Sequence, residues 1–163
     1  MMIVKKAELS DVPQIVSLWQ EFMDEHDEII IAENPLLKDI EIKDKNMQHS
    51  YQVFLTSHIK SDSGVVFIAL ENNIIVAYAL IFIKDEIPIY QNKKVGYISD
   101  LFVKKEFRNH SISSKLMDKS MQWFKKKGIR FAAVPLYPDN KLAHSFYKNK
   151  GFFDYKVEMR KKI

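Results

Sequence analysis

Apolar residues recur at the spacing of one helix face in four segments of the chain. The helices are expected over residues 10–28, 46–60, 111–127 and 139–149. Ser10 is the expected N-cap of the first helix, which ends in an acidic cluster, and residues 29–45 after it have no clear assignment. The third helix has the clearest division between an apolar face and a lysine-rich face, and Gly128 is expected to follow its end.

Runs rich in β-branched and aromatic residues lie between these helices. Strands are expected over residues 3–7, 64–70, 74–83, 95–103, 131–134 and 154–161. Asn72 and Asn73 tolerate positive φ, so they predict a hairpin between the second and third strands. The fourth and fifth strands flank a helix and should be parallel, with a right-handed connection. The chain is therefore expected to have a mixed α+β (mixed α/β) fold.

The composition indicates one globular domain spanning residues 1–163, with 47% hydrophobic residues and a formal net charge of +4. Because cysteine is absent, disulfides, cysteine nucleophiles and thiolate zinc sites are excluded. The four glycines lie far apart in the sequence, so neither a GxGxxG dinucleotide loop nor a phosphate-binding P-loop is present.

The same sequence indicates where the protein resides and what it does not bind. The longest apolar run, residues 74–83, is shorter than the ~20 residues that a membrane helix needs. The first residues lack the apolar region of a signal peptide, so we expect a cytoplasmic protein. Its histidines form no HExxH or HxxxH pair, and its lysine runs lack neighbouring aromatics. We therefore expect no metal, no nucleic acid and no membrane partner.

Residues 103–115, VKKEFRNHSISSK, carry the most informative pattern of polar side chains. A strand ends here, a basic turn follows, and a helix begins. The first turn of a helix leaves four N–H groups unpaired and carries about half a positive charge, so it can bind a phosphate or pyrophosphate. Alternatively, Ser111 simply caps the helix and the basic residues are exposed. The sequence pattern leaves both interpretations open.

Three stretches resemble the GCN5-related N-acetyltransferase (GNAT) superfamily. YISDLFV followed by KKEFR resembles its fourth strand and the turn after it. RNHSIS, residues 108–113, stands where the family carries its (Arg/Gln)-x-x-Gly-x-(Gly/Ala) pyrophosphate loop, and DNKLAHSFYKNKGF, residues 139–152, resembles its late helix. This resemblance implies the GNAT fold, a mostly antiparallel twisted sheet with one parallel strand pair, flanked by about four helices.

The resemblance also implies the activity and the site. The protein would transfer an acetyl group from acetyl-CoA to a primary amine of a small molecule, polyamine or peptide, by direct attack in a ternary complex. The residues implied to bind the cofactor are Leu101, Phe102, Val103, Arg108, Asn109, His110, Ser111, Ile112, Ser113, Ser114, Asn140 and Tyr147. A backbone N–H between Leu101 and Val103 would stabilise the oxyanion.

Two of these residues have an alternative structural role. Tyr147 matches the tyrosine that the family often uses to protonate the departing thiolate, but its helical spacing also fits a core residue beside Phe146. Asn140 matches a cofactor-contacting asparagine, and it is equally suited to cap a helix.

The sequence departs from the family pattern at two places. Ser111 and Ser113 replace the small residues of the loop, and serine is strained wherever a positive φ is required, so weaker cofactor binding is expected. Ser99 stands where many members place a catalytic glutamate. Asp100 is the candidate catalytic carboxylate instead, but adjacent strand residues face opposite sides unless a bulge intervenes.

These departures leave a second function open, that of a non-catalytic CoA- or acyl-CoA-binding regulatory protein with the same fold. The acidic cluster of Asp24, Glu25, Asp27, Glu28 and Glu33 would either attract a cationic acceptor or form a solvated helix end. Homodimers are common in the family, and the sequence offers no decisive interface for one.

Overall fold

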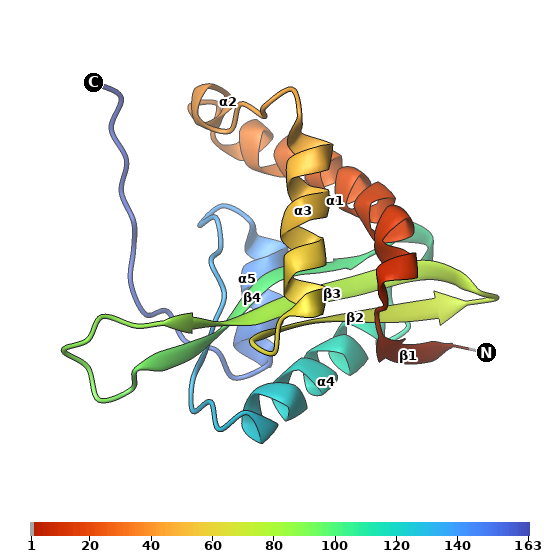
Figure 1. Ribbon diagram of the computed structural model, residues 1–163. Coiled ribbons are helices and arrows are strands. Elements are labelled where there is room, and N and C mark those ends of the chain that lie inside the picture. The colour runs from red at the N-terminus through yellow and green to blue at the C-terminus, as the bar shows by residue number, and fades with distance from the viewer. Residues whose placement is uncertain (1) are drawn as a thin grey trace.

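A five-stranded sheet forms the centre of the molecule in a computed structural model, which describes residues 2–163. Met1, the first residue of the expected domain, lies outside the described residues. The strands are β1 (Ile3–Lys6), β2 (Gly64–Glu71), β3 (Ile74–Asp85), β4 (Lys94–Val103) and β5 (Ala132–Ala133), in the spatial order β1-β2-β3-β4-β5. All neighbours are antiparallel except β4 and β5, which are parallel. The expected mixed fold with one parallel pair is confirmed (Figure 1).

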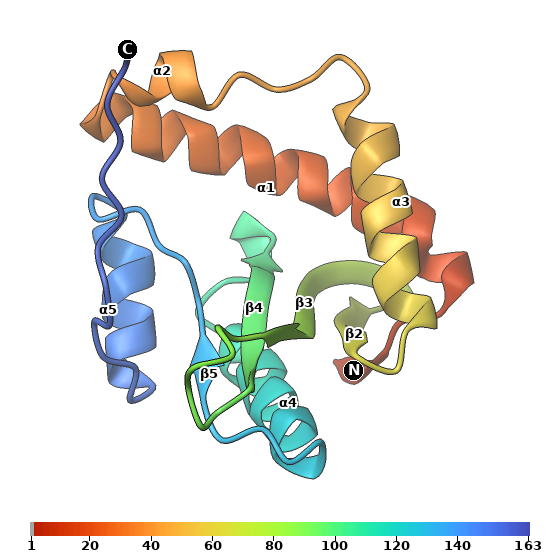
Figure 2. The same ribbon diagram turned by 60° about the vertical axis from the view of Figure 1, so that its left-hand side comes forward.

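Helices cover both faces of this sheet. On one face lie α1 (Val12–Glu33), α2 (Leu37–Ile40) and α3 (Met47–Lys60), and on the other lies α4 (Ile112–Lys126), with α5 (Lys141–Asn149) beside it (Figure 2). Short 3-10 turns, η1 (Leu9–Asp11) and η2 (Lys105–Phe107), precede α1 and α4. No helix within residues 2–163 is both long and apolar enough to cross a membrane.

Alternation along the central strands separates two hydrophobic cores. Tyr78 and Leu80 pack with α1 and α3, while Ala79 and Ile81 pack with α4 and α5. Gly96 of β4 lets the Phe124 ring lie against the sheet, because a Cβ at this position would lie 2.6 Å from Phe124 Cε1. The sheet is therefore buried on both faces at its centre, as its continuous apolar runs predict.

The first helix differs from its predicted limits at both ends. Ser10 lies inside η1 and is not the N-cap, because Glu8 N–H donates to Asp11 Oδ2 at 2.9 Å and the α-helix starts at Val12. The helix also continues through the acidic cluster to Glu33, so the cluster lies within the helix rather than at its end. Pro35 then stops it.

The predicted last strand is wrong. Residues 154–161, all of which the structure describes, form no strand and run as an exposed segment from α5 towards α2 (Figure 2). An alternating sequence needs a neighbouring strand to pair with, and β5 consists of only Ala132 and Ala133 before Pro135 removes a backbone donor. Lys162 Nζ ends the segment in an ion pair with Asp39, 2.9 Å away.

Candidate functional site

The carboxyl half of β4 has one uncovered edge. Within residues 2–163, β5 pairs with β4 only at Gly96 and Tyr97, and β3 occupies the opposite edge along the whole strand. Lys104 N–H donates to Val76 O of β3, so the two-residue alternation directs the N–H groups of Leu101 and Val103 towards the uncovered edge. Two backbone donors are therefore available beside each other at this edge.

A bulge in β4 sets the orientation of Asp100. The register pairs Ile81 with Ile98 and Leu80 with Asp100, so Ser99 is the extra residue. Ile98 belongs to the core on the α4 side, whereas the Asp100 side chain contacts α3 on the other side. The bulge that Asp100 needs is present, and Ser99 Oγ donates to Asp100 Oδ1 at 3.1 Å.

The Asp100 carboxylate is buried among hydroxyl groups. Its Oδ2 accepts from Tyr51 Oη at 2.5 Å and from Tyr78 Oη at 3.3 Å. Burial raises the pKa of Asp100, and the hydrogen bonds from Tyr51, Ser99 and Tyr78 oppose that rise. Three donors use three of the roughly four acceptor positions of a carboxylate, which leaves room for one more donor.

Tyr51, which the sequence analysis did not select, contacts Asp100 together with Tyr78, a strand tyrosine whose sequence fits either a site residue or a packing residue. Their spacing matches the apolar faces of a helix and a strand, which is also what core residues show. Trp19 stacks on Tyr51 with ring centroids 4.2 Å apart and holds it in place. Only the residue type could have indicated these two tyrosines from the sequence, because a buried tyrosine hydroxyl usually has a polar partner.

The loop before α4 contains two non-glycine residues in the left-handed backbone conformation. Asn109 and Ser111 both have positive φ, at 67° and 58°. Ser111 is thus strained at the position where the family has glycine. Ser111 stands at the N-cap position of α4 and its carbonyl accepts from Lys115 N–H, but among the described residues its side chain makes no hydrogen bond to the helix. Ser113 and Ser114 lie half-buried in the first helical turn, with backbone N–H groups unpaired within the helix.

The Arg108 side chain contacts β4 and α1. Its Nε donates to Val103 O at 2.9 Å, and its Nη2 lies 2.6 Å from Glu25 Oε2 of α1. The guanidinium also lies 5.7 Å from the Phe102 ring centroid. Arg108 therefore joins the loop to β4 and α1, and Phe102 lies on the α1 side of the sheet.

The remaining loop residues have distinct environments. His110 is exposed, with Nδ1 2.9 Å from Arg108 O, while Ile112 is buried in the core beneath α4. Asn140 Oδ1 accepts from Ala143 N–H at 3.2 Å, so Asn140 does cap α5.

Tyr147 is a core residue that also carries a hydroxyl group. It is buried in the α4-side core with its ring against Phe146 and Phe152. Its hydroxyl forms no hydrogen bond within residues 2–163. Burial raises the pKa of Tyr147, and the negative charge of Asp100 raises it further, so the phenol stays protonated at neutral pH. Tyr147 thus lies in the core on the α4 side of the sheet, whereas the Asp100 side chain contacts α3 on the other side.

Two of the five carboxylates in the acidic cluster of α1 are paired with cations. Glu25 pairs with Arg108, and Asp27 pairs with Lys43 at 2.9 Å. Asp24 accepts from the amide of Gln20 at 2.8 Å. These contacts favour a structural role for the cluster over attraction of a cationic acceptor.

Comparisons with known proteins agree on one family. The acetyltransferase (GNAT) family model matches residues 17–152. N-alpha-acetyltransferase 30 of Schizosaccharomyces pombe is 28% identical over 131 residues, which cover 78% of this chain and 85% of that protein. An uncharacterized N-acetyltransferase of Methanocaldococcus jannaschii is 33% identical over 67 residues, which cover 41% of this chain and 30% of the relative.

Two solved structures have the same fold. A predicted acetyltransferase from Clostridium acetobutylicum, solved with acetyl-CoA, has a TM-score of 0.78 at 24% identity, covering 99% of this chain and 96% of that one. AAC(6')-Iy in complex with a bisubstrate analogue, CoA-S-monomethyl-acetylneamine, has a TM-score of 0.73 at 16% identity, covering 100% and 99% of the two chains.

Proposed function

Because this chain belongs to the acetyltransferase (GNAT) family, we propose that it transfers the acetyl group of acetyl-CoA to a primary amine by direct attack within a ternary complex. The observation that carries the proposal is the uncovered edge of β4. Ile112 of α4 and Tyr147 share a core with Val103 on one side of this strand, and the Asp100 side chain faces α3 on the other side.

The residues present are suited to hold acetyl-CoA. The unpaired N–H groups that open α4, near Ser113 and Ser114, would bind the pyrophosphate with the help of the helix dipole. The edge N–H groups of Leu101 and Val103 would bind the extended arm and the thioester oxygen. Arg108 would act indirectly, by fixing the loop against Val103 and Glu25.

The reaction then needs two proton movements. The amine nitrogen attacks the thioester carbonyl carbon, the C–S bond breaks, and the nitrogen loses a proton. Asp100 would receive this proton, either directly or through water, since its carboxylate has room for one further donor. Tyr147 would donate its phenolic proton to the departing thiolate, because a tyrosine is protonated at neutral pH and this hydroxyl makes no hydrogen bond within the described residues.

A non-catalytic CoA-binding protein is the second candidate. The sequence grounds for it are the departures from the family pattern at Ser99, Ser111 and Ser113, and the related N-acetyltransferases do not favour it. The two candidates differ in a single measurable step, the transfer of the acetyl group to an amine.

Calorimetric titration with CoA, combined with an assay for free thiol in the presence of amines, tests the proposal. Ser113→Leu should reduce CoA affinity about tenfold or more, because the larger side chain blocks the amides that open α4. Ser50→Leu places the same change in the exposed first turn of α3 and should leave affinity unchanged. CoA binding without acetyl transfer to any amine would favour the second candidate, and unchanged affinity in Ser113→Leu would contradict the loop assignment.

A further inference from the structure

Four aromatic rings form a partly exposed surface on the α3 side of the sheet. They are Phe54 and His58 of α3, Phe82 of β3 and Tyr97 of β4, called here the aromatic patch. The His58 ring lies 4.4 Å from both Phe54 and Phe82, and Phe82 lies 5.1 Å from Tyr97. Phe82 and Tyr97 are directly opposite in the β3–β4 register, so the sheet fixes their side-by-side arrangement.

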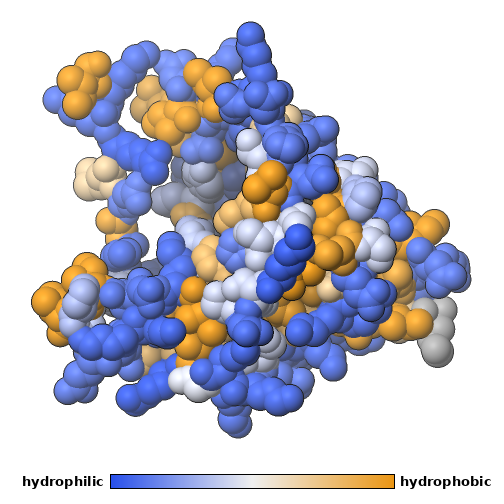
Figure 3. Space-filling model, in the orientation of Figure 1, coloured by the Kyte–Doolittle hydropathy of each residue, from blue (hydrophilic) through white to orange (hydrophobic). Residues whose placement is uncertain are grey.

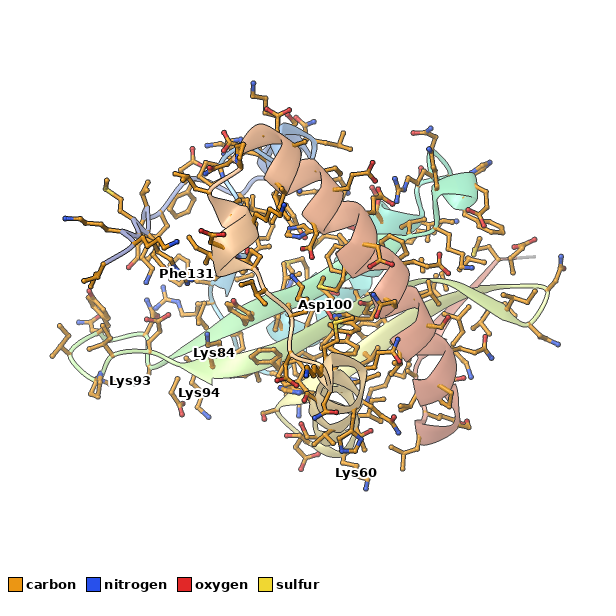
Figure 4. All side chains as sticks on the ribbon, turned by 90° about the horizontal axis from the view of Figure 1, so that it is seen from above. Lys60, Lys84, Lys93, Lys94, Asp100 and Phe131 are labelled. Atoms are coloured by element: carbon orange, nitrogen blue, oxygen red, sulfur yellow. The ribbon has the colours of Figure 1, made fainter. Side chains whose placement is uncertain are left out.

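The aromatic patch continues inward to Asp100. The ring centroids of Phe54 and Tyr51 lie 6.3 Å apart, and the Tyr51 hydroxyl donates to the Asp100 carboxylate. In the β3–β4 register Asp100 lies opposite Leu80 and Tyr97 opposite Phe82, two residues further along β3, so both side chains lie on the α3 side of the sheet. In Figure 4, Asp100 lies near the middle of the molecule and Lys84 nearer the β3–β4 hairpin. An acceptor lying on the rings would therefore have its amine close to Asp100.

The shape of the molecule is compatible with this approach. Figure 3 shows the surface hollowed between the part formed by α1 and α2 and the β3–β4 hairpin below it. Phe54 keeps 37% of its surface exposed, and Phe82 and Tyr97 are half-buried, so the rings remain accessible.

Charges around the aromatic patch distinguish between classes of amine. The carboxylates of Glu25 and Asp27 on α1 already pair with Arg108 and Lys43. Lys84 lies 4.1 Å above the Tyr97 ring and adds a positive charge at the rim. Asp100 is the carboxylate beside the rings that could receive an incoming ammonium, and a second or third positive charge on the acceptor would meet Lys84 at the rim.

We propose, given the acetyltransferase function above, that the aromatic patch binds the apolar group of the acceptor and that Asp100 receives its single amine. The acceptor class is then a monoamine with an aromatic or branched apolar group close to the nitrogen, rather than a polyamine or an aminoglycoside. An arylalkylamine and the amino terminus of a peptide beginning with apolar residues share this chemistry.

A panel of acceptors tests the inference. Phenethylamine and a short peptide with apolar first residues should each be acetylated with at least about tenfold higher kcat/KM than spermidine and neamine. The relative rates of the first two acceptors distinguish a small amine from a peptide. Equal or greater preference for spermidine or neamine would overturn the inference while leaving the acetyltransferase function intact. If CoA binds and none of the four amines is acetylated, the function itself fails and the inference fails with it.

Variants of Phe54 locate the acceptor. Phe54→Ser should raise KM for the favoured acceptor about tenfold without changing CoA affinity, and Phe54→Leu should restore most of the loss. Leu142→Ser removes a 78%-exposed apolar side chain from α5 and serves as the matched control. Thermal unfolding of each variant confirms that it folds, and an unchanged KM in a folded Phe54→Ser protein would contradict the assignment.

Discussion

Replacing Ser111 by glycine should make the protein more stable. Ser111 has φ 58° and ψ 18°, a left-handed conformation that costs a non-glycine residue about 1–2 kcal/mol. Among the described residues its side chain caps nothing, so Ser111→Gly loses no hydrogen bond at the helix start. Glycine is more flexible in the unfolded chain, which offsets about 0.4–1 kcal/mol. The net gain is therefore about 0.5–1 kcal/mol.

Ser113→Gly is the matched control, because the same change two residues later falls inside α4. Ser113 has helical geometry, and glycine there should cost about 0.5 kcal/mol relative to serine. The two substitutions should therefore shift the unfolding free energy in opposite directions. Equilibrium urea unfolding measures both, and the melting temperature of Ser111→Gly should rise by about 2 °C.

The same strain should affect the cofactor. If the loop of residues 108–111 already has its binding conformation in the free protein, Ser111→Gly should bind CoA at least as tightly as the unmodified chain. A Ser111→Gly protein that is less stable than the original, or no more stable than Ser113→Gly, would refute the reasoning about left-handed strain.

Three further predictions concern the site. Tyr147→Phe should lower kcat more than it lowers CoA affinity in steady-state kinetics and calorimetry, because the proposed role of the hydroxyl is to protonate the leaving thiolate; an unaffected rate would make Tyr147 a packing residue. The folded-state pKa of Asp100 is raised, so its contribution to stability is fully present below the unfolded pKa of about 3.9 and is lost as pH rises through the higher folded value. Unfolding free energies from pH 3 upwards should therefore fall with pH more steeply for the unmodified chain than for Asp100→Asn, and parallel curves would contradict this. Arg108→Gln and Glu25→Gln should weaken CoA binding by similar factors if the ion pair fixes the loop, whereas tighter binding in Glu25→Gln would show that Arg108 is needed at the phosphate.

The spacing of apolar residues predicted most helices and strands, because burying one face of a helix or strand requires apolar residues at regular intervals. The helix at residues 112–126 and the hairpin at Asn72 and Asn73 follow the predicted limits closely, and both asparagines have the expected positive φ. The error at residues 154–161 has a different origin. Alternation describes how a strand would face a core, but it does not provide the neighbouring strand that the segment would need.

The site was less accessible to sequence reasoning than the fold. The motif at residues 108–113 located the loop, but its sequence does not reveal that Arg108 points to Glu25, 83 residues away along the chain. The partners of Asp100 come from α3 and β3, so only the tertiary structure brings them together. Long-range pairs of this kind depend on packing, and no local spacing records them.

The extra residue at Ser99 affects how sequences of this family are aligned. In an unbroken strand, moving an acidic residue by one position transfers it to the opposite side of the sheet. Here Ser99 and Asp100 touch each other on one side, so an acid at either position is presented to the same space. A column-by-column alignment would compare an acid of a relative with Ser99, although the Asp100 carboxylate, one residue further along, faces the same space.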